Sequence, residues 1–232
     1  MAVELFNNGK HTCLAFYDLV DEEHDHAVQC NQFMIADSGH GALIDPGGNL
    51  TYNALLMAMQ RYFPSKELVW LLASHPDPDI IASVNKWFVA SPCKVLISKL
   101  WTRFVPHFTT GRDIQGRIGG IPDEGMDIPL GASKIKAIPA HFMHAEGNFQ
   151  FYDPISKILF SGDLGVSLVD HDVAADPVVD FDAHLPLMEP FHRRYMVSNK
   201  ILRFWAHMAR QMDIEMIVPQ HGQRFVGKAM CA

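Results

Sequence analysis

The sequence is poor in charge: 19% of its 232 residues are Asp, Glu, Lys or Arg, against roughly 25% in an average soluble domain. The charge that is present is unbalanced, with 26 acidic against 19 basic residues and a formal net charge of -7. A negative excess of this kind is repelled by phosphate backbones and by anionic lipid surfaces. We therefore expect neither nucleic acid nor a membrane as a partner.

Paired cysteines and long apolar runs are also missing. The four cysteines, Cys13, Cys30, Cys93 and Cys231, form no Cys-x-x-Cys pair, which argues against a zinc ribbon, a thioredoxin-type motif and a secreted disulfide framework. The longest apolar stretch, 68–73, is far shorter than the ~20 residues of a membrane span, and the N-terminus lacks the apolar core of a signal peptide. A cytoplasmic location fits these absences best.

Hydrophobic residues, in contrast, make up 48% of the chain, and no Pro/Ser-rich linker divides it. We therefore expect residues 1–232 to form a single domain, because a chain of this size buries most of its apolar surface in one core. Periodicity predicts strands at 12–20, 31–37, 41–45, 68–74, 94–97, 134–139, 149–152, 158–161 and 214–219. It predicts helices at 50–63, 80–89, 100–104 and 183–212, with loops at 109–122 and around 171–177. Polar clusters at strand ends favour an α/β (α+β) fold of two sheets between outer helices over a doubly wound parallel sheet.

Histidine is unusually frequent, with 13 copies, and the first candidate site contains one of them. The segment His75-Pro-Asp77-Pro-Asp79 follows the apolar run 68–74, and its two prolines stiffen the loop. Imidazole and carboxylate ligands together suit zinc, iron or manganese better than copper. The same residues also fit a Pro-Asp turn whose last aspartate caps a helix that starts near Ile80. Taken alone, the segment leaves both interpretations open.

The same arrangement recurs three times further along the chain. His144 follows the predicted strand 134–139, Asp163 follows 158–161 and His221 follows 214–219. Because a sheet brings strand ends together at one edge, we expect these side chains to meet His75 and the two nearby aspartates in a single pocket. The recurrence favours a metal site. The contiguous charged segment 21–26 also has metal-binding residue types, but we interpret it as a solvated turn.

The order SHPDPD, HFMH, SGD and PQHG resembles the metallo-β-lactamase superfamily, and it is similar in particular to the flavodiiron branch and the related oxygen-binding diiron proteins. The resemblance extends from LIDPG at 43–47 to His221. It implies an αββα sandwich of two mixed sheets flanked by helices. Relatives of the flavodiiron type continue into a flavodoxin domain that delivers electrons, whereas this sequence ends at Ala232, so we expect an external electron donor.

The resemblance also implies a ligand set for two iron ions, with zinc or manganese as the alternative. One ion would be held by His75, Asp77 and His144, the other by Asp79 and His221, and Asp163 would bridge them. Hydrolases of this fold usually have histidine in place of Asp77 and of Ile80. An added carboxylate favours iron, and Ile80 is expected to leave a coordination position open and to shape the cavity there.

Three further residues are candidates for supporting roles around the metals. Asp45, in LIDPGG, resembles the aspartate that orients active-site histidines in this superfamily, although a Pro-Gly turn aspartate explains it equally well. His141 is either a supporting or spare donor or a solvent-facing histidine. Tyr195 lies where the resemblance places aromatic residues beside the diiron pocket, with a buried structural tyrosine as the alternative.

These expectations lead to a functional hypothesis with two alternatives. The chain is expected to be a non-haem diiron protein that binds dioxygen, or another diatomic such as NO, as a sensor or carrier with at most slow oxidase activity. The first alternative is a dinuclear metallo-hydrolase acting on an ester, lactone, thioester or phosphoester. The second is an interaction module that binds no metal. The resemblance further implies a redox or signalling partner protein and a homodimer.

Overall fold

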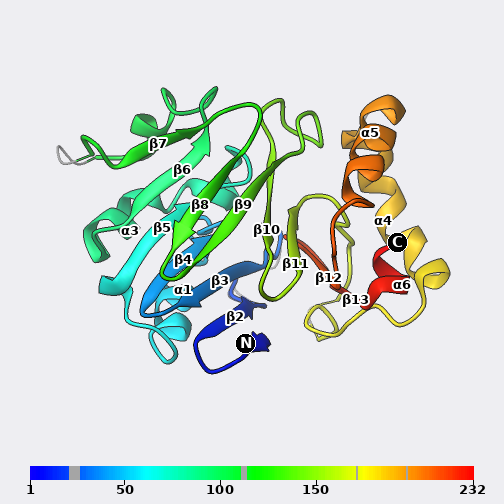
Figure 1. Cartoon of the computed structure of the whole chain (residues 1–232), viewed down its shortest axis with the longest axis horizontal. Helices are drawn as coiled ribbons and strands as arrows, with labels where there is room; N and C mark the ends of the chain where they lie inside the picture. The colour runs from blue at the N-terminus through cyan, green and yellow to red at the C-terminus, as the bar shows by residue number, and fades with distance from the viewer. Residues whose placement is uncertain (21–26, 111–113, 171, 197) are drawn as a thin grey trace.

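The computed structural model describes residues 1–20, 27–110, 114–170, 172–196 and 198–232. The charged segment 21–26 lies outside the described residues. Two mixed sheets pack face to face and helices cover their outer faces, so the expected αββα sandwich is confirmed (Figure 1).

The first sheet has the strand order β1-β2-β3-β4-β5-β6-β7 within the described chain. Its first four strands pair antiparallel, and β4 to β7 pair in parallel. The strands are β1 (Ala2–Asn7), β2 (His11–Phe16), β3 (Gln32–Asp37), β4 (His40–Ile44), β5 (Leu68–Leu72), β6 (Lys94–Ser98) and β7 (Ile118–Ile121).

The second sheet has the order β13-β12-β11-β10-β9-β8 among the described strands. All neighbours in it are antiparallel except β11 and β12, which run in parallel. The strands are β8 (Met126–Leu130), β9 (Ser133–Pro139), β10 (Phe149–Asp153), β11 (Ile158–Gly162), β12 (Met216–Pro219) and β13 (Phe225–Val226).

The helices flank these sheets. They are α1 (Tyr52–Met59), α2 (Pro78–Ile81), α3 (Val84–Ala90), α4 (Phe181–Tyr195), α5 (Asn199–Ala209) and α6 (Lys228–Cys231), with 3₁₀ turns at Ser65–Glu67 and Val105–Phe108. None of the helices in the described part of the chain is both long and apolar enough to cross a bilayer.

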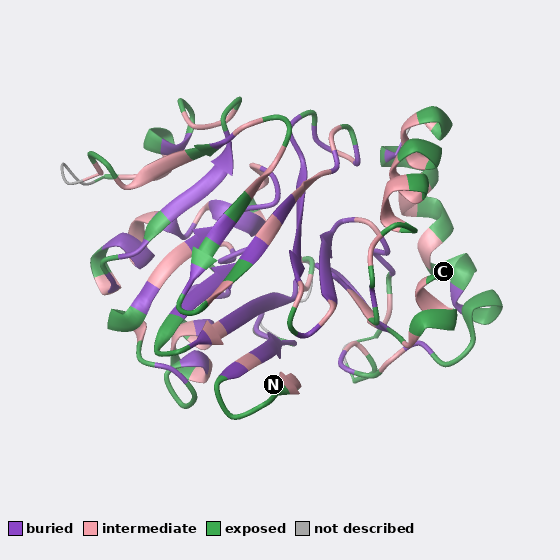
Figure 2. Cartoon of the chain, in the orientation of Figure 1, coloured by how far each residue is buried: buried purple, intermediate pink, exposed green. Residues whose placement is uncertain are grey.

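Side chains alternate between the two faces of the central strands, so these strands contribute to two hydrophobic cores, one beneath the helices and one between the sheets. On β2, Leu14 and Phe16 pack under α1, α2 and α3, whereas Cys13 and Ala15 face the second sheet. Most residues of β2, β3 and β4 are therefore buried, because both faces of these strands are covered (Figure 2). A smaller cluster joins the second sheet to α5 through Tyr152, Leu159 and Trp205.

Several predicted elements are wrong. The helix expected at 100–104 consists of turns, and the loop expected at 109–122 contains β7. The single long helix expected at 183–212 is two helices, because Met196 leaves helical geometry and Ser198 caps α5 by accepting a hydrogen bond from the Ile201 N–H. The helix expected at 80–89 is likewise divided into α2 and α3.

Candidate metal centre

The loops that follow β5, β9, β11 and β12 meet at one edge of the sandwich. Backbone hydrogen bonds join them: the Phe149 N–H donates to the Ser74 carbonyl at 2.9 Å, and the Gln220 N–H donates to the Gly162 carbonyl at 2.8 Å. Five of the six predicted metal ligands lie on these loops, and the sixth, Asp79, lies in the first turn of α2 directly after the loop that follows β5. The sequence-based expectation that strand ends assemble the candidate residues therefore describes this edge correctly.

A first donor group consists of His75, Asp77 and His144. One ligand atom from each of these residues lies within 4.8 Å of the others. The Asp77 Oδ2 atom is 3.6 Å from His75 Nε2 and 3.5 Å from His144 Nε2. Asp77 occupies the N-cap position of α2 but makes no side-chain capping bond. Its carboxylate is therefore free to face the imidazoles instead of the helix.

Asp163 lies between this group and a second one. Its Oδ2 atom is 2.8 Å from His144 Nε2 and 3.5 Å from His75 Nε2. Its Oδ1 atom is 3.8 Å from His221 Nε2, and that same nitrogen is 3.3 Å from Asp79 Oδ2. The two oxygens of one buried carboxylate thus face two different donor groups, which is the arrangement that a bridging ligand requires.

The surrounding polar groups orient these imidazoles. The Ser74 hydroxyl is 2.9 Å from His75 Nδ1, and His221 Nδ1 donates to the Gln29 carbonyl at 2.6 Å. Because these contacts occupy Nδ1 of each ring, Nε2 is directed into the centre. This pattern is typical of metal-ligating histidine. Asp45 accepts the Ser74 N–H at 2.8 Å. Asp45 therefore contacts the centre through Ser74.

Charge pairing controls the titration of the metal-free centre. Hydrogen bonds to Asp163 and Asp77 raise the pKa of His144 to about 10, and hydrogen bonds from His144 and His75 hold the pKa of Asp77 well below its usual range. Burial opposes ionisation of Asp163, yet the His144 hydrogen bond and the nearby imidazoles lower its pKa overall. Burial raises the pKa of Asp45 to about 6, with the Ser74 N–H acting in the opposite direction.

A cavity of about 820 Å³ opens onto the centre, and Tyr195 and Phe191 of α4 form part of its wall. The Tyr195 ring lies 5.5 Å from the His144 ring and 4.7 Å from Phe191, measured between centroids. Tyr195 is 44% exposed, so the buried structural alternative for this residue is wrong.

Neither Ile80 nor His141 is among the described residues that line this cavity. Ile80 is fully buried in the core beneath the first sheet and is not among the described residues that line the cavity, so its expected role in shaping that cavity is wrong. His141 bonds through Nε2 to the Asp123 carbonyl at 2.8 Å and lines a separate surface pocket with Lys99 and Glu146. It is therefore directed away from the metal centre.

Sequence reasoning missed four residues that contact the ligands. Ser74 could have been found from its position directly before His75. Gln220, which donates to Asp79 Oδ2 at 3.3 Å, directly precedes His221 in the same way. Phe191 and the Gln29 carbonyl gave no usable signal, because one is an ordinary helical aromatic and the other is a backbone atom.

Comparisons with known proteins identify the fold and the family of the chain. A solved structure described as the peroxy diiron species of chemotaxis sensor ODP is 38% identical, covers 99% of this chain and 90% of its own, and superposes with a TM-score of 0.86. A flavo-diiron protein from Thermotoga maritima shares the fold at 17% identity, with a TM-score of 0.79 over 97% of this chain and 57% of its own.

A curated relative, an uncharacterized protein from Methanocaldococcus jannaschii, is 23% identical over 198 residues, which is 83% of this chain. The chain spans about half the length of that relative, 48%. The family model described as "ODP family beta lactamase" matches residues 28–222. The match covers most of the chain, and the chain belongs to this family.

Proposed function

We propose that the chain is a non-haem diiron protein that binds dioxygen and acts as an oxygen sensor or carrier. The observation that carries this proposal is the position of Asp163, whose two oxygens face two separate donor groups. Its buried Oδ1 atom has no hydrogen-bond partner within the described residues. A buried carboxylate oxygen without a partner is costly, and a cation on that side would satisfy it.

The donor set fits iron. Three carboxylates and three imidazoles supply only oxygen and nitrogen, without the thiolates that soft metals prefer. Manganese and zinc accept the same donor types and remain the alternatives. The proposed ligands are His75, Asp77 and His144 for one ion, Asp79 and His221 for the other, and Asp163 between them. When bound, two ferrous ions supply the electrons for binding O₂.

The protein itself contributes geometry and a low-polarity pocket. Val166, Leu168 and Phe191 line the cavity next to the ligands, and apolar walls of this kind exclude water from a site that takes a nonpolar gas. We propose that the Tyr195 ring holds the His144 imidazole in place and that its hydroxyl donates a hydrogen bond to the bound gas. Support comes from its position beside His144 on the cavity wall.

The cavity volume keeps a second candidate function open. About 820 Å³ also accommodates an organic ester, lactone, thioester or phosphoester. A dinuclear metallo-hydrolase would bind such a molecule and attack it with a metal-bound hydroxide. Asp77 argues against this function, because it stands where the hydrolases of this fold usually have histidine.

Addition of O₂ to the anaerobic, iron-reconstituted protein tests the proposal. A visible charge-transfer band should appear at two irons per chain, and a featureless spectrum at that iron content would contradict dioxygen binding. Two bound zinc ions with turnover of a chromogenic ester would favour the hydrolase. If the protein bound no stoichiometric metal, the remaining function would be that of an interaction module.

The remaining expectations are also proposals. The four cysteines are free in the structure, which supports a cytoplasmic location. The continuous pairing within each sheet supports residues 1–232 as one domain. We further propose that a partner protein supplies electrons or receives the signal, with reduction of O₂ or NO as the reaction if the centre turns over. We also propose that two copies of the chain form a homodimer, which light scattering would show as a doubled molecular mass.

A further inference from the structure

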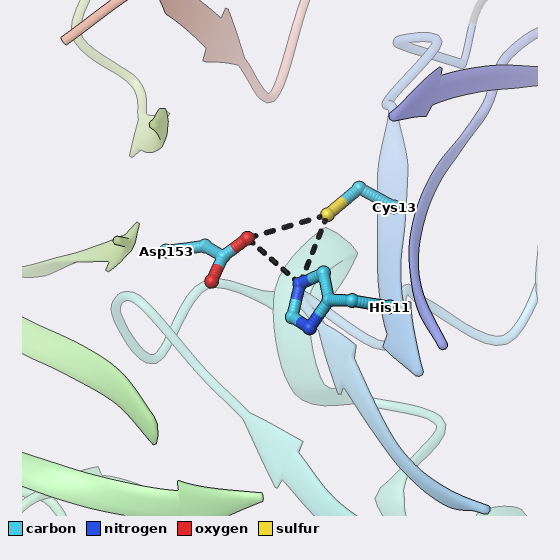
Figure 3. A group of neighbouring side chains, drawn as sticks. All are labelled: His11, Cys13 and Asp153. Atoms are coloured by element: carbon cyan, nitrogen blue, oxygen red, sulfur yellow. Dashed lines mark hydrogen bonds and ion pairs between the residues drawn. The ribbon is translucent and has the colours of Figure 1, made fainter. Parts of the chain in front are cut away.

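A second group of metal-binding side chains lies between the two sheets, far from the centre described above. His11 and Cys13 are two residues apart on β2 and therefore point to the same face of the strand. Asp153 comes from the end of β10 in the opposite sheet, and its carboxylate points toward the other two side chains (Figure 3). All three residues are almost fully buried. The other end of β10 contacts Ser74 through Phe149, so the two sites lie at opposite ends of this strand.

The spacing of the three side chains matches a metal site. His11 Nε2 is 2.9 Å from Asp153 Oδ2, and Cys13 Sγ is 3.7 Å from that nitrogen and 3.5 Å from that oxygen. A point about 2.0 Å from all three atoms exists within this triangle, close to the zinc–ligand distances of about 2.0 to 2.3 Å. We propose that these residues form a closed zinc site that joins the two sheets.

Asp37 orients the histidine for this role. His11 Nδ1 is 3.1 Å from Asp37 Oδ1, while the other oxygen of Asp37 accepts the Ala132 N–H at 2.6 Å. A carboxylate that accepts the Nδ1–H keeps the proton on that nitrogen and leaves Nε2 for the metal. The carboxylate–histidine–metal arrangement is the usual support of a zinc-bound imidazole.

Ser156 completes the set of donors. Its N–H donates to Asp153 Oδ2 at 3.0 Å, its hydroxyl bonds to the same oxygen, and that hydroxyl also lies beside Cys13. The four side chains thus offer one nitrogen, one sulfur and two oxygens. Structural zinc sites are four-coordinate, and the Ser156 hydroxyl, which contacts both Asp153 and Cys13, is the fourth ligand of the proposed site.

Zinc coordination requires deprotonated ligands. Binding therefore releases the proton of the Cys13 thiol, and any proton on His11 Nε2, to solvent. The burial of all ligands means that the ion enters as the chain folds.

The test uses full-length protein in which the first centre is disabled by Asp163→Ala and His144→Ala, so that its outcome does not depend on the proposed function. This background is refolded from guanidinium with zinc, desalted and analysed for metal. One zinc per chain should remain bound. Adding Cys13→Val should remove it, whereas Cys93→Val, at an equally buried cysteine that contacts the Trp87 carbonyl instead, should not.

Refolding with cobalt gives a second readout that does not require the Cys13 variant to fold. A sulfur-to-cobalt charge-transfer band should appear in the background protein with Cys13 intact. Zinc below one tenth of an equivalent in that background would overturn the proposal, and so would zinc retained by a folded Cys13→Val variant. A cobalt spectrum without the thiolate band would overturn it as well.

Discussion

Asp45→Asn should stabilise the metal-free fold while it weakens metal binding. In the folded chain Asp45 is fully buried, and burial raises the pKa of its carboxyl from 3.8 to about 6 against the opposing Ser74 hydrogen bond. The folded state therefore keeps the Asp45 proton up to a higher pH than the unfolded state does. The free energy of unfolding consequently falls as pH rises from 3.8 to about 6. Above pH 6 the ionised carboxylate costs the fold about 3 kcal/mol, at about 1.36 kcal/mol per pKa unit.

Asparagine removes this cost because its amide carries no charge. It tolerates the left-handed backbone of position 45, where φ is 51°, and its amide oxygen can still accept the Ser74 N–H. The variant should gain about 3 kcal/mol at pH 8 and roughly half of that at pH 5. Metal affinity should fall by about 10- to 100-fold, because the charge behind Ser74 and His75 is lost.

Urea unfolding of the metal-free proteins at pH 5 and pH 8, followed by circular dichroism, measures the stability difference. The exposed substitution Asp176→Asn serves as the control and should change little at either pH. A stabilisation by Asp45→Asn that stays constant or shrinks between pH 5 and pH 8 would refute the reasoning, because it would show that burial does not penalise the Asp45 carboxylate.

Three further predictions concern the ligands and the cavity. Asp163→Ala should reduce bound iron from two ions per chain to one or none by elemental analysis, and two retained ions would rule out a bridging role. Metal affinity should rise with pH up to about 10, because an ion must displace the proton that Asp163 and Asp77 stabilise on His144. Calorimetry in buffers of different ionisation heat should detect the released proton. Identical heats of metal binding in all buffers would contradict this prediction. Tyr195→Phe should keep both irons and shorten the lifetime of the O₂-dependent band several-fold in stopped-flow absorption, whereas an unchanged lifetime would exclude a hydrogen bond from the phenol.

The sequence predicted the positions of the candidate ligands because each follows an apolar strand, and strand ends of a sheet share an edge. It could not predict which way a loop turns, so it left His141 either as a supporting donor or as a solvent-facing histidine, whereas in the structure His141 Nε2 bonds to the Asp123 carbonyl. For Ile80, periodicity marked a helix without showing that its side chain packs in the core away from the cavity. Both points concern the direction of a side chain, which depends on tertiary contacts.

The errors in secondary structure have local causes. The strand β8 was not predicted. It contains Pro129, which lowers strand propensity and is tolerated because β8 lies at the edge of its sheet. The break between α4 and α5 was hidden because residues on both sides favour helix, and the Ser198 cap became recognisable only from its hydrogen bond to the Ile201 N–H. Capping residues inside a helical pattern are therefore easily read as part of one longer helix.

Electron paramagnetic resonance of the two-iron protein after exposure to O₂ tests the central claim most directly. If the Asp163 carboxylate, whose two oxygens face His144 and His221, holds two irons in one centre, the ferric ions should couple magnetically. Iron analysis should then give two ions per chain with almost no signal from isolated high-spin ferric iron. A strong isolated-ferric signal that accounts for all the bound iron would contradict a bridged diiron centre.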